Sequence, residues 1–555
     1  MGTSNIALRA PIKDAWLDPS GNGLPSRVAQ NWLISVTQAV QQQTVLPLTL
    51  FGSVGSGSDD TAAFQAAVNQ AGALGGATIF IPPGNYSAAS ISVPANAAPV
   101  TFLGCGEASV ITRRGALAAG VGMFDISASN VTFDSLVLDG AILTPVGLFY
   151  NRDFSTALGP NDPMAPSLTT NTSVWVHGPA QNIRFTNIRI SHSGGYAILL
   201  DCMPGGISGV EISNCRFTNN RPNLFGVPGG VAAFGSYGGG VYINGDGRNS
   251  GAGKIAQHIL VDGSTFARNN GNCLWTHVYG FKEMHSDIRV IGNGFLDIGL
   301  DGVLMGGVTG GGVIGNVFRR VGYITQSDTD RSVPQWLANL NATAIDSSGL
   351  VKSVTYADNV MISVNGGAVD MDGHGLSVVA NNVVRIPYPD EPEYEEDQIA
   401  ISGNTNSGST SYGINISCTS GIIYGANGLT ITGNTLLNLL AGAIRLFAAR
   451  NCLVSGNSIA APPNSVIQPI TMGPIGPAPG QRCYGNKVTL NNFDYAPPAA
   501  APCVQELDTY GTFSATDVNT VCNNNPINPP GTPAIEFTKS ANSGSTVYAE
   551  TVWLP

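Results

Sequence analysis

Two aspartates, Asp370 and Asp372, stand two positions apart in the short apolar run Val369-Asp370-Met371-Asp372. Alternate side chains of a strand point to opposite faces, so both carboxylates leave one face with their Cα atoms roughly 6.6 Å apart. Inverting glycosidases use two carboxyl groups about 6.5–9.5 Å apart, one to protonate the leaving oxygen and one to activate water. We therefore take this pair as the candidate acid and base. The alternative is that two surface acids bind a cation or stay solvated.

Two more residues are candidates for a role in catalysis or substrate binding near this pair. Asp301, in the phrase GLDGVL, precedes the strand that we place one coil earlier, from where it would reach Asp370 diagonally as a third carboxylate. The alternative role for Asp301 is a turn aspartate that caps the backbone. His374 lies between two glycines in DGHGLSV, as a substrate contact or as a plain turn residue.

Eight tetrapeptides repeat the alternation of the Asp370 strand, with mostly aliphatic first and third residues that should face inward. They begin at Val174, Ile198, Val241, Leu274, Val303, Val369, Ile414 and Ile444. Their second and fourth residues then form two outward columns. The members of these columns that suit sugar stacking or hydrogen bonding are Trp175, Tyr242, Trp275, His277, Asp201, Asn244 and Arg445. This alignment puts Trp275 and Arg445 each two coils, about 10 Å, from Asp370, and Asp201 four coils from Asp372.

A column of polar turn residues supports this alignment. It comprises Asn187, Asn214, Ser264, Asn293, Asn316, Asn382, Asn434, Asn457 and Asn486. Self-similarity at a nearly fixed period predicts a solenoid, whose coils bury their inner faces against each other. Stacked amides can hydrogen-bond from one coil to the next, so we interpret this column as structural. Three long excursions, 218–240, 322–355 and 385–412, are expected to rise near the outward columns.

Composition narrows the range of partners. The chain of 555 residues carries a net charge of −11 and 70 glycines, with 11% charged residues, and no basic patch is visible. Nucleic acid and membrane are therefore not expected as partners, and no apolar run of about 20 residues would span a bilayer. The nine cysteines are scattered without a C-x-x-C, which indicates mostly buried reduced thiols. We expect no metal and no cofactor.

A helix is predicted near the start of the repeats. Asp59 or Asp60 can cap it near Thr61, and Gly75-Gly76 can end it. Its apolar stripe consists of Ala63, Phe64, Ala67, Val68 and Ala71. A strand, ATIFIPPGNY, follows. Upstream of it, GLPSRVAQNWLISV opens a second, amphipathic helix.

The phrase DDTAAFQAAVNQA…GGATIFIPPGNY resembles the opening motif of pectate-lyase-like right-handed parallel β-helices, a group rich in bacteriophage tailspikes and polysaccharide depolymerases. The resemblance implies an all-β, single-stranded right-handed parallel β-helix over 49–495. Residues 1–48 would form a helical virion-attachment or assembly segment, because GLPSRVAQNWLISV is similar to N-terminal stretches of phage tail proteins. Residues 496–555 would form a small C-terminal β region that begins with a Pro/Ala linker and contains a β-hairpin. In tailspike-like proteins such a region joins three chains, which implies a homotrimer.

The DGHGL turn also resembles the Gly-His-Gly turn of polygalacturonase-type hydrolases. That family carries its acids on other motifs, and its Arg-Ile-Lys is absent here. We expect an endo-acting phage tailspike-type depolymerase that is made in the host cytoplasm and assembled into the virion. Its tail or baseplate would hold the N-terminus while it inverts glycosidic bonds of a bacterial capsule, exopolysaccharide or O-antigen. A polysaccharide lyase and a non-catalytic adhesin are the alternatives, with a deacetylase a more distant one.

Overall fold

A computed structural model gives the fold. It describes residues 44–97, 99–115, 121–141, 172–220, 239–269, 271–324, 337–338, 342–347, 350–364, 367–371, 400–402, 405–407, 412–416, 426–437, 439, 442–460, 469–475, 482–494, 502–507, 518–522, 524–527, 537–538, 540–541 and 543–548. The predicted helix upstream of Thr44 lies outside these residues, as do Asp372 and His374.

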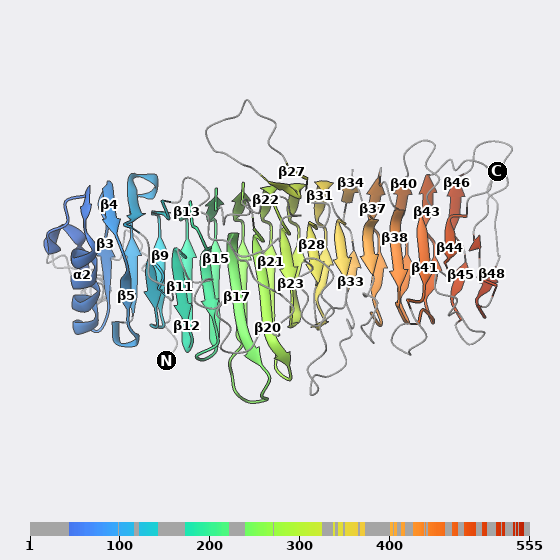
Figure 1. The fold of residues 1–555 in the computed structure, drawn as a ribbon, viewed down its shortest axis with the longest axis horizontal. Coiled ribbons are helices and arrows are strands. Elements are labelled where there is room, and N and C mark those ends of the chain that lie inside the picture. Colours follow the sequence, from blue (N-terminus) through green and yellow to red (C-terminus); the bar gives the residue numbers. More distant parts are fainter. Residues whose placement is uncertain are drawn as a thin grey trace, which may run out of the picture.

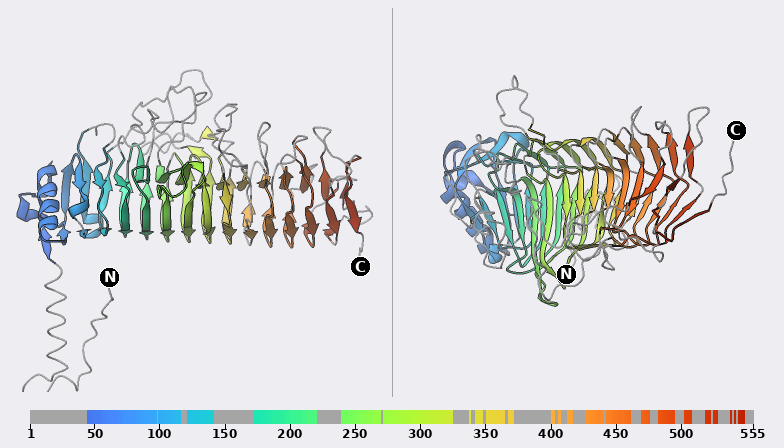
Figure 2. Two further views of the ribbon diagram at one scale, coloured as in Figure 1. Left: turned by 90° about the horizontal axis from the view of Figure 1, so that it is seen from below. Right: turned by 45° about the vertical axis from the view of Figure 1, so that its right-hand side comes forward.

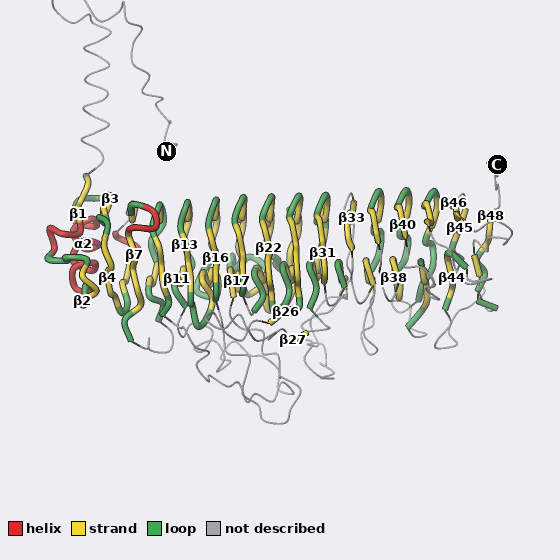
Figure 3. Tube along the Cα trace, turned by 90° about the horizontal axis from the view of Figure 1, so that it is seen from above, coloured by secondary structure: helices red, strands yellow, loops and turns green. Residues whose placement is uncertain are grey.

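The chain winds into an elongated coil whose turns each contribute one strand to three parallel sheets (Figures 1 and 2). One such turn consists of β11 (Val174–His177), β12 (Ala180–Thr186) and β13 (Arg189–Ser191). The next turn begins with β14 (Tyr196–Asp201), which pairs in parallel with β11. Figure 3 shows the turns as successive rungs along the axis. Apart from the antiparallel pair β26 (Tyr323–Ile324) and β27 (Leu337–Ala338), the described strands form parallel sheets of 17, 15 and 14 strands, which confirms the predicted right-handed parallel β-helix.

The first rung is closed by α2 (Thr61–Ala73), as the sequence predicts (Figure 1). Its buried face is the predicted stripe, and it packs beside β3 (Ala77–Phe80) and β5 (Ile91–Val93). Asp59 Oδ1 accepts a hydrogen bond from the Thr61 N–H at 3.0 Å, and Asp60 Oδ2 accepts one from the Ser87 N–H at 3.1 Å. The two carboxylates therefore fix the start of the helix and tie it to the first rungs.

The interior of the coil is filled by side chains that repeat from rung to rung. In the 15-stranded sheet, Phe217, Phe266, Phe295 and Phe318 stack with ring centroids 4.5–4.9 Å apart. These rings are fully buried, so each rung buries its apolar face against its neighbours. The core therefore runs along the axis.

Asparagine ladders run from rung to rung at the bend between the 17-stranded and the 15-stranded sheet, as predicted. Each backbone N–H donates to the side-chain oxygen of the next residue in the run at 2.8–3.1 Å. The two runs are Asn293, Asn316 and Asn359, then Asn434, Asn457, Asn491 and Asn524. The buried amides thus pair with each other, which explains why a polar residue recurs at an interior position.

Membership of the predicted column needs correction. Asn187 and Asn214 are in register with Gly263, one position before Ser264 of the column. Their φ values of 55° and 53° are left-handed, where a short polar side chain is tolerated. Asn486 belongs to a separate ladder in which its N–H donates to Asn519 at 3.1 Å. Asn382 lies outside the described residues, and Asn359 occupies the rung after Asn316.

A whole rung lies where the sequence predicted a long excursion. Between β23 (Val303–Met305) and β32 (Val369–Met371), the structure contains β28 (Ile345–Ser347), β30 (Thr355–Ala357) and β31 (Val360–Val364). β28 pairs in parallel with both β23 and β32. The strands before this rung are therefore one coil farther from Asp370 than the sequence alignment placed them.

The coil also continues past residue 495, where the sequence predicted its end. β44 (Val504–Glu506) and β47 (Phe537–Thr538) extend the 14-stranded sheet, while β45 (Thr520–Cys522) and β48 (Thr546–Tyr548) extend the 17-stranded sheet. All these pairings are parallel, so the predicted C-terminal β-hairpin is wrong. In the described part of the chain, no helix is long and apolar enough to cross a membrane.

Candidate functional site

The outer face of the 14-stranded sheet carries the predicted sugar-binding columns. In register from rung to rung, its main outward column reads Ser92, Asp125, Trp175, Leu199, Tyr242, Trp275, Leu304, Asp346, Asp370, Asn415, Arg445, Thr471 and Gln505. The predicted order holds on both sides of Asp346. The sequence alignment missed Asp346 itself.

Asp346 and Asp370 are direct neighbours on this face. They are paired residues of β28 and β32, so their Cα atoms are about 4.8 Å apart. Both are half-buried, while the flanking Val369 and Met371 are buried in the coil. The structure thus gives Asp370 a partner carboxylate on the next rung. The sequence signal for Asp346 was weak because Ser347 replaces the expected inward aliphatic residue of ATAIDS.

The two carboxylates have different neighbours along the column. On the C-terminal side, Asn415 of β35 (Tyr412–Ile416) donates from Nδ2 to Asp370 Oδ1 at 2.8 Å. On the N-terminal side, the residue in register with Asp346 is the apolar Leu304. An amide donor favours an ionised carboxylate, whereas an apolar neighbour favours a protonated one. The surroundings therefore distinguish the two acids.

Arg445 lies two rungs beyond Asp370, as predicted. It belongs to β38 (Gly442–Phe447), and its guanidinium carbon lies 4.0 Å from the ring centroid of Phe447 and 5.3 Å from that of Tyr412. These rings hold the cation on the outer face through cation–π contacts. We call Asp346, Asp370, Asn415 and Arg445 the carboxylate row.

The aromatic side chains of the N-terminal half pack on each other. The ring of Tyr242 lies between those of Tyr196 and Trp275, with centroid distances of 4.7 and 4.6 Å. Tyr242 is 2% exposed and Trp275 7%, so neither presents a ring face to solvent, contrary to the role expected for them. Trp275 is also three rungs, about 14 Å, from Asp370 rather than two. Of the three predicted sugar-stacking rings, Trp175 is half-buried and remains partly accessible.

A His–Asp pair adjoins Trp175. His177 Nε2 lies 2.8 Å from Asp125 Oδ1, and the imidazole centroid is 3.8 Å from that of Trp175. On the next rung Asp201 Oδ1 accepts the Met203 N–H at 3.1 Å. Burial raises the pKa of Asp201 above its ordinary value, although the Met203 N–H and His177 act in the opposite direction. We call Asp125, Trp175, His177 and Asp201 the His–Asp cluster.

The His–Asp cluster cannot share chemistry with Asp370. Asp201 is five rungs from Asp370, about 24 Å, where the sequence placed it four rungs from Asp372. The two other predicted contacts, Asn244 and His277, are held by their neighbours. The Tyr242 hydroxyl donates to Asn244 Oδ1 at 3.3 Å, and the half-buried His277 ring meets the ring of Tyr279 edge-on at 4.7 Å.

Asp301 occupies a structural position. Its Oδ1 accepts hydrogen bonds from the Thr343 N–H at 2.8 Å and from the Thr343 hydroxyl at 3.2 Å. The residue is 9% exposed, and it precedes β23, two rungs before β32 rather than one. The capping alternative fits these contacts, and the geometry argues against Asp301 as a third catalytic carboxylate.

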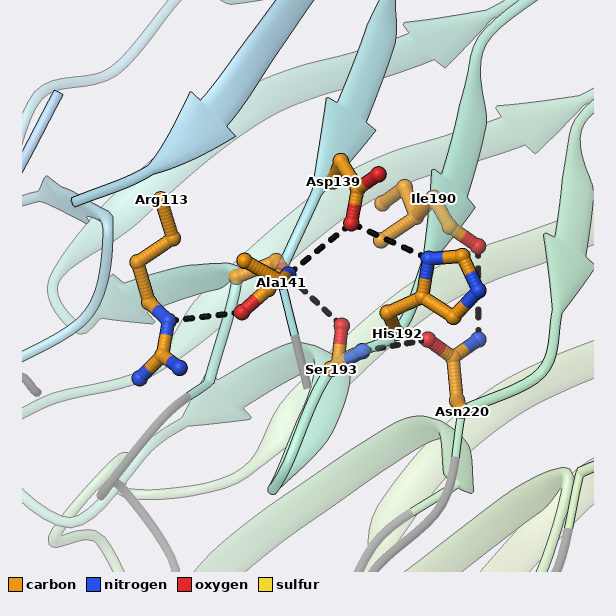
Figure 4. Close-up of polar contacts among 9 residues, drawn as sticks. Arg113, Asp139, Ala141, Ile190, His192, Ser193 and Asn220 are labelled. Atoms are coloured by element: carbon orange, nitrogen blue, oxygen red, sulfur yellow. Dashed lines mark hydrogen bonds and ion pairs between the residues drawn. The ribbon is translucent and has the colours of Figure 1, made fainter. Parts of the chain in front are cut away.

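A second His–Asp pair lies on another face of the coil and has nearly the same exposure as the pair of His177 and Asp125 (Figure 4). His192 Nδ1 lies 3.0 Å from Asp139 Oδ1, at the end of β10 (Val137–Asp139) in the 15-stranded sheet. Side-chain exposures are 18% and 25% in this pair, against 19% and 26% for His177 and Asp125. Burial would raise the pKa of Asp139, but the His192 and Ala141 hydrogen bonds outweigh it and lower that pKa. Within the described residues, no group of three or more His, Cys, Asp or Glu has the geometry to hold a metal ion.

A comparison with proteins of known structure finds chains that are similar to this one. The chain is similar to the A-module of a mannuronan C-5 epimerase from Azotobacter vinelandii, at 14% identity and a TM-score of 0.43, over 91% of this chain and 100% of that one. It is similar to PfbA, a surface adhesin of Streptococcus pneumoniae, at 16% identity and a TM-score of 0.48, over 75% and 90%. It is also similar to the Dettilon tailspike protein, at 13% identity and a TM-score of 0.39, over 90% and 69%.

No protein-family model and no curated protein matches the chain. At these identities and TM-scores, a functional conclusion has to come from the residues of the chain itself.

Proposed function

We propose that the protein is a polysaccharide depolymerase of the phage tailspike type that hydrolyses glycosidic bonds at the carboxylate row. The observation that carries the proposal is the register of Asp346 with Asp370 on the outer face of the coil. Glycoside hydrolysis needs two carboxyl groups that flank one bond, and Asp370 is the shared member of both possible pairs. Its partner is either Asp346 or Asp372, the second aspartate of the predicted pair.

The substrate class follows from the same face. A negatively charged row with a single arginine favours a neutral or weakly charged glycan over a polyanion, because a net charge of −11 repels polyanions. Half-buried Trp175 offers an aromatic surface for a sugar ring. We infer a bacterial surface polysaccharide as the partner, with the N-terminal segment joining a phage tail and three chains forming the spike.

The test is depolymerisation of purified capsular polysaccharides, exopolysaccharides and O-antigens, followed by reducing-end release and by the mass of the products. Asp370→Asn should lower the rate about 100- to 10,000-fold while leaving glycan binding intact. The control is Asp139→Asn, an aspartate that is also half-buried but lies on another sheet. A variant that retains full activity without Asp370 would overturn hydrolysis at this row. Binding of a polysaccharide that the native protein never cleaves would instead establish an adhesin.

A lyase is the second candidate, favoured by one observation. Arg445 is two rungs, about 10 Å, from Asp370 and is held by Phe447, and an arginine can serve a lyase as its base. Elimination leaves an unsaturated sugar that absorbs near 235 nm, whereas hydrolysis releases reducing ends without new absorbance. Recording both signals in one digest separates the two reactions.

A further inference from the structure

We propose that Asp346 is the general acid and Asp370 the nucleophile of a retaining hydrolysis, in place of the inverting pair that the sequence suggested. This inference rests on the proposed function, because it specifies the chemistry of the same site. Carboxyl groups of retaining glycosidases are about 5–5.5 Å apart, whereas inverting enzymes need about 6.5–9.5 Å to admit a water molecule. Residues in register on adjacent parallel strands have Cα atoms about 4.8 Å apart, so two side chains that leave the sheet face in the same direction hold their carboxyl groups nearer to the shorter separation than to the longer one.

The roles are inferred from the residues that stand in register with each carboxylate on the neighbouring rungs. Asp370 Oδ1 accepts the Asn415 amide at 2.8 Å, and that hydrogen bond favours the ionised form that a nucleophile requires. Asp346 lies between Asp370 and Leu304, so it faces a like charge on one side and an apolar side chain on the other. Both neighbours disfavour a negative charge on Asp346 and favour the protonated form of an acid.

The reaction then proceeds in two balanced steps. An Asp370 oxygen attacks the anomeric carbon, the bond from that carbon to the leaving sugar breaks, and Asp346 gives its proton to the leaving oxygen. Asp346, now ionised, takes a proton from water, whose oxygen attacks the same carbon and releases the Asp370 carboxylate. Two displacements at one carbon restore its original configuration, so the product keeps the anomeric configuration of the substrate.

Asn415 would act through Asp370 as a positioning residue. Asn415→Leu removes the amide donor but keeps a side chain of similar size in the column. Without that donor, Asp370 ionises less readily, so the acidic limb of the pH–rate profile should move to higher pH. A residue with a purely structural role would lower stability without moving this limb.

The experiment uses the polysaccharide that the native chain depolymerises. Proton NMR of the first product formed, before mutarotation, reports its anomeric configuration, and retention is expected. Asp346→Asn should lower the rate about 100- to 10,000-fold, while Asp372→Asn should stay within about 10-fold of the native rate. Circular dichroism and urea unfolding of each variant confirm that it is folded.

Two results would overturn the assignment. An inverted product, or a loss of activity in Asp372→Asn with Asp346→Asn still active, would return the second role to Asp372. In both cases Asp370→Asn would remain inactive and the proposed hydrolysis would stand. Full activity of Asp370→Asn would refute the hydrolase itself, so the two failures are distinguishable.

Discussion

The two halves of one sheet face use the same outward column in opposite ways. In the N-terminal half, Leu199, Tyr242 and Trp275 point outward yet are only 2–7% exposed, because they stack into a second apolar cluster. In the C-terminal half, the same positions hold Asp346 and Asp370, which remain half-buried. An outward position on a coil therefore does not establish a binding surface. Whether an outward side chain is buried or accessible depends on the side chains in register with it on the neighbouring rungs.

The largest effect should follow from removing an outward ring of the N-terminal half. Trp275→Ala is expected to lower the free energy of unfolding by about 3–5 kcal/mol, because it leaves a cavity beside Tyr242. Urea unfolding followed by circular dichroism measures the change, with Trp275→Phe as the milder control. An unchanged stability together with weaker glycan binding would contradict this and show that the ring stacks on a bound sugar.

Acid should lower the stability of the coil through His285, a fully buried residue of β21 (His285–Ile291) in the 17-stranded sheet. Its Nδ1 accepts the Ala256 N–H at 2.9 Å and its Nε2–H donates to the His277 carbonyl at 2.8 Å, so the neutral ring is held on both sides. Burial lowers its pKa to about 4. A lowered histidine pKa means that the unfolded chain takes up the proton first, so its contribution is intact above pH 6.5 and falls as the pH approaches 4. The loss is about 3 kcal/mol below pH 4.

Urea unfolding of the native chain and of His285→Gln at pH 7.5, 5.5 and 4 measures this contribution. The variant should be less stable at pH 7.5 and should show a shallower decline with acid. Equal pH slopes for both proteins would refute the role given to His285.

Asp301 should affect stability rather than catalysis. Asp301→Ala leaves the Thr343 N–H without its acceptor and should cost about 1–3 kcal/mol. Asp301→Asn keeps an acceptor oxygen and should unfold at nearly the native urea concentration. Both variants, assayed where they are folded, should depolymerise at close to the native rate. A large drop in the rate of a folded Asp301→Asn protein would restore it as a catalytic carboxylate.

The smallest effect is expected from the two His–Asp pairs, His177–Asp125 and His192–Asp139. Asp125→Asn and Asp139→Asn each remove a carboxylate from a partly buried His–Asp pair, at an expected cost below about 1 kcal/mol. Both variants should depolymerise within about twofold of the native rate, since neither carboxylate belongs to the carboxylate row. If Asp125→Asn alone loses activity, the N-terminal half contributes to catalysis and not only to sugar binding.

Much of the fold follows from local sequence. The capped helix that begins at Thr61 and the buried Asn293–Asn316 ladder were predicted because each rests on contacts between neighbouring rungs. Of the seven neighbouring pairs predicted among the eight aligned strands, six form, and the exception is β23 with β32, which β28 separates. Alternation and turn residues are sufficient for such contacts.

The candidate site was less predictable, because it depends on how many rungs separate two residues. The rung of β28 escaped notice since it has only Ile345 as an inward aliphatic residue and Ser347 in the next inward place. Its omission removed Asp346 from the site and moved Asp301 one rung too close to Asp370. Burial of Tyr242 and Trp275 was also missed, because stacking between outward rings depends on packing that a single-strand pattern does not record.

The helix α2 has a consequence for assembly. A parallel coil ends in unpaired strand edges that can recruit another chain and grow into a fibre. At the first rung, Phe64, Ala67 and Val68 of α2 are fully buried against the core, and the helix thus plugs the apolar end of the solenoid. The helix covers the surface on which a further rung would stack, which leaves the flanks and the opposite end of the coil as the surfaces open to a second copy.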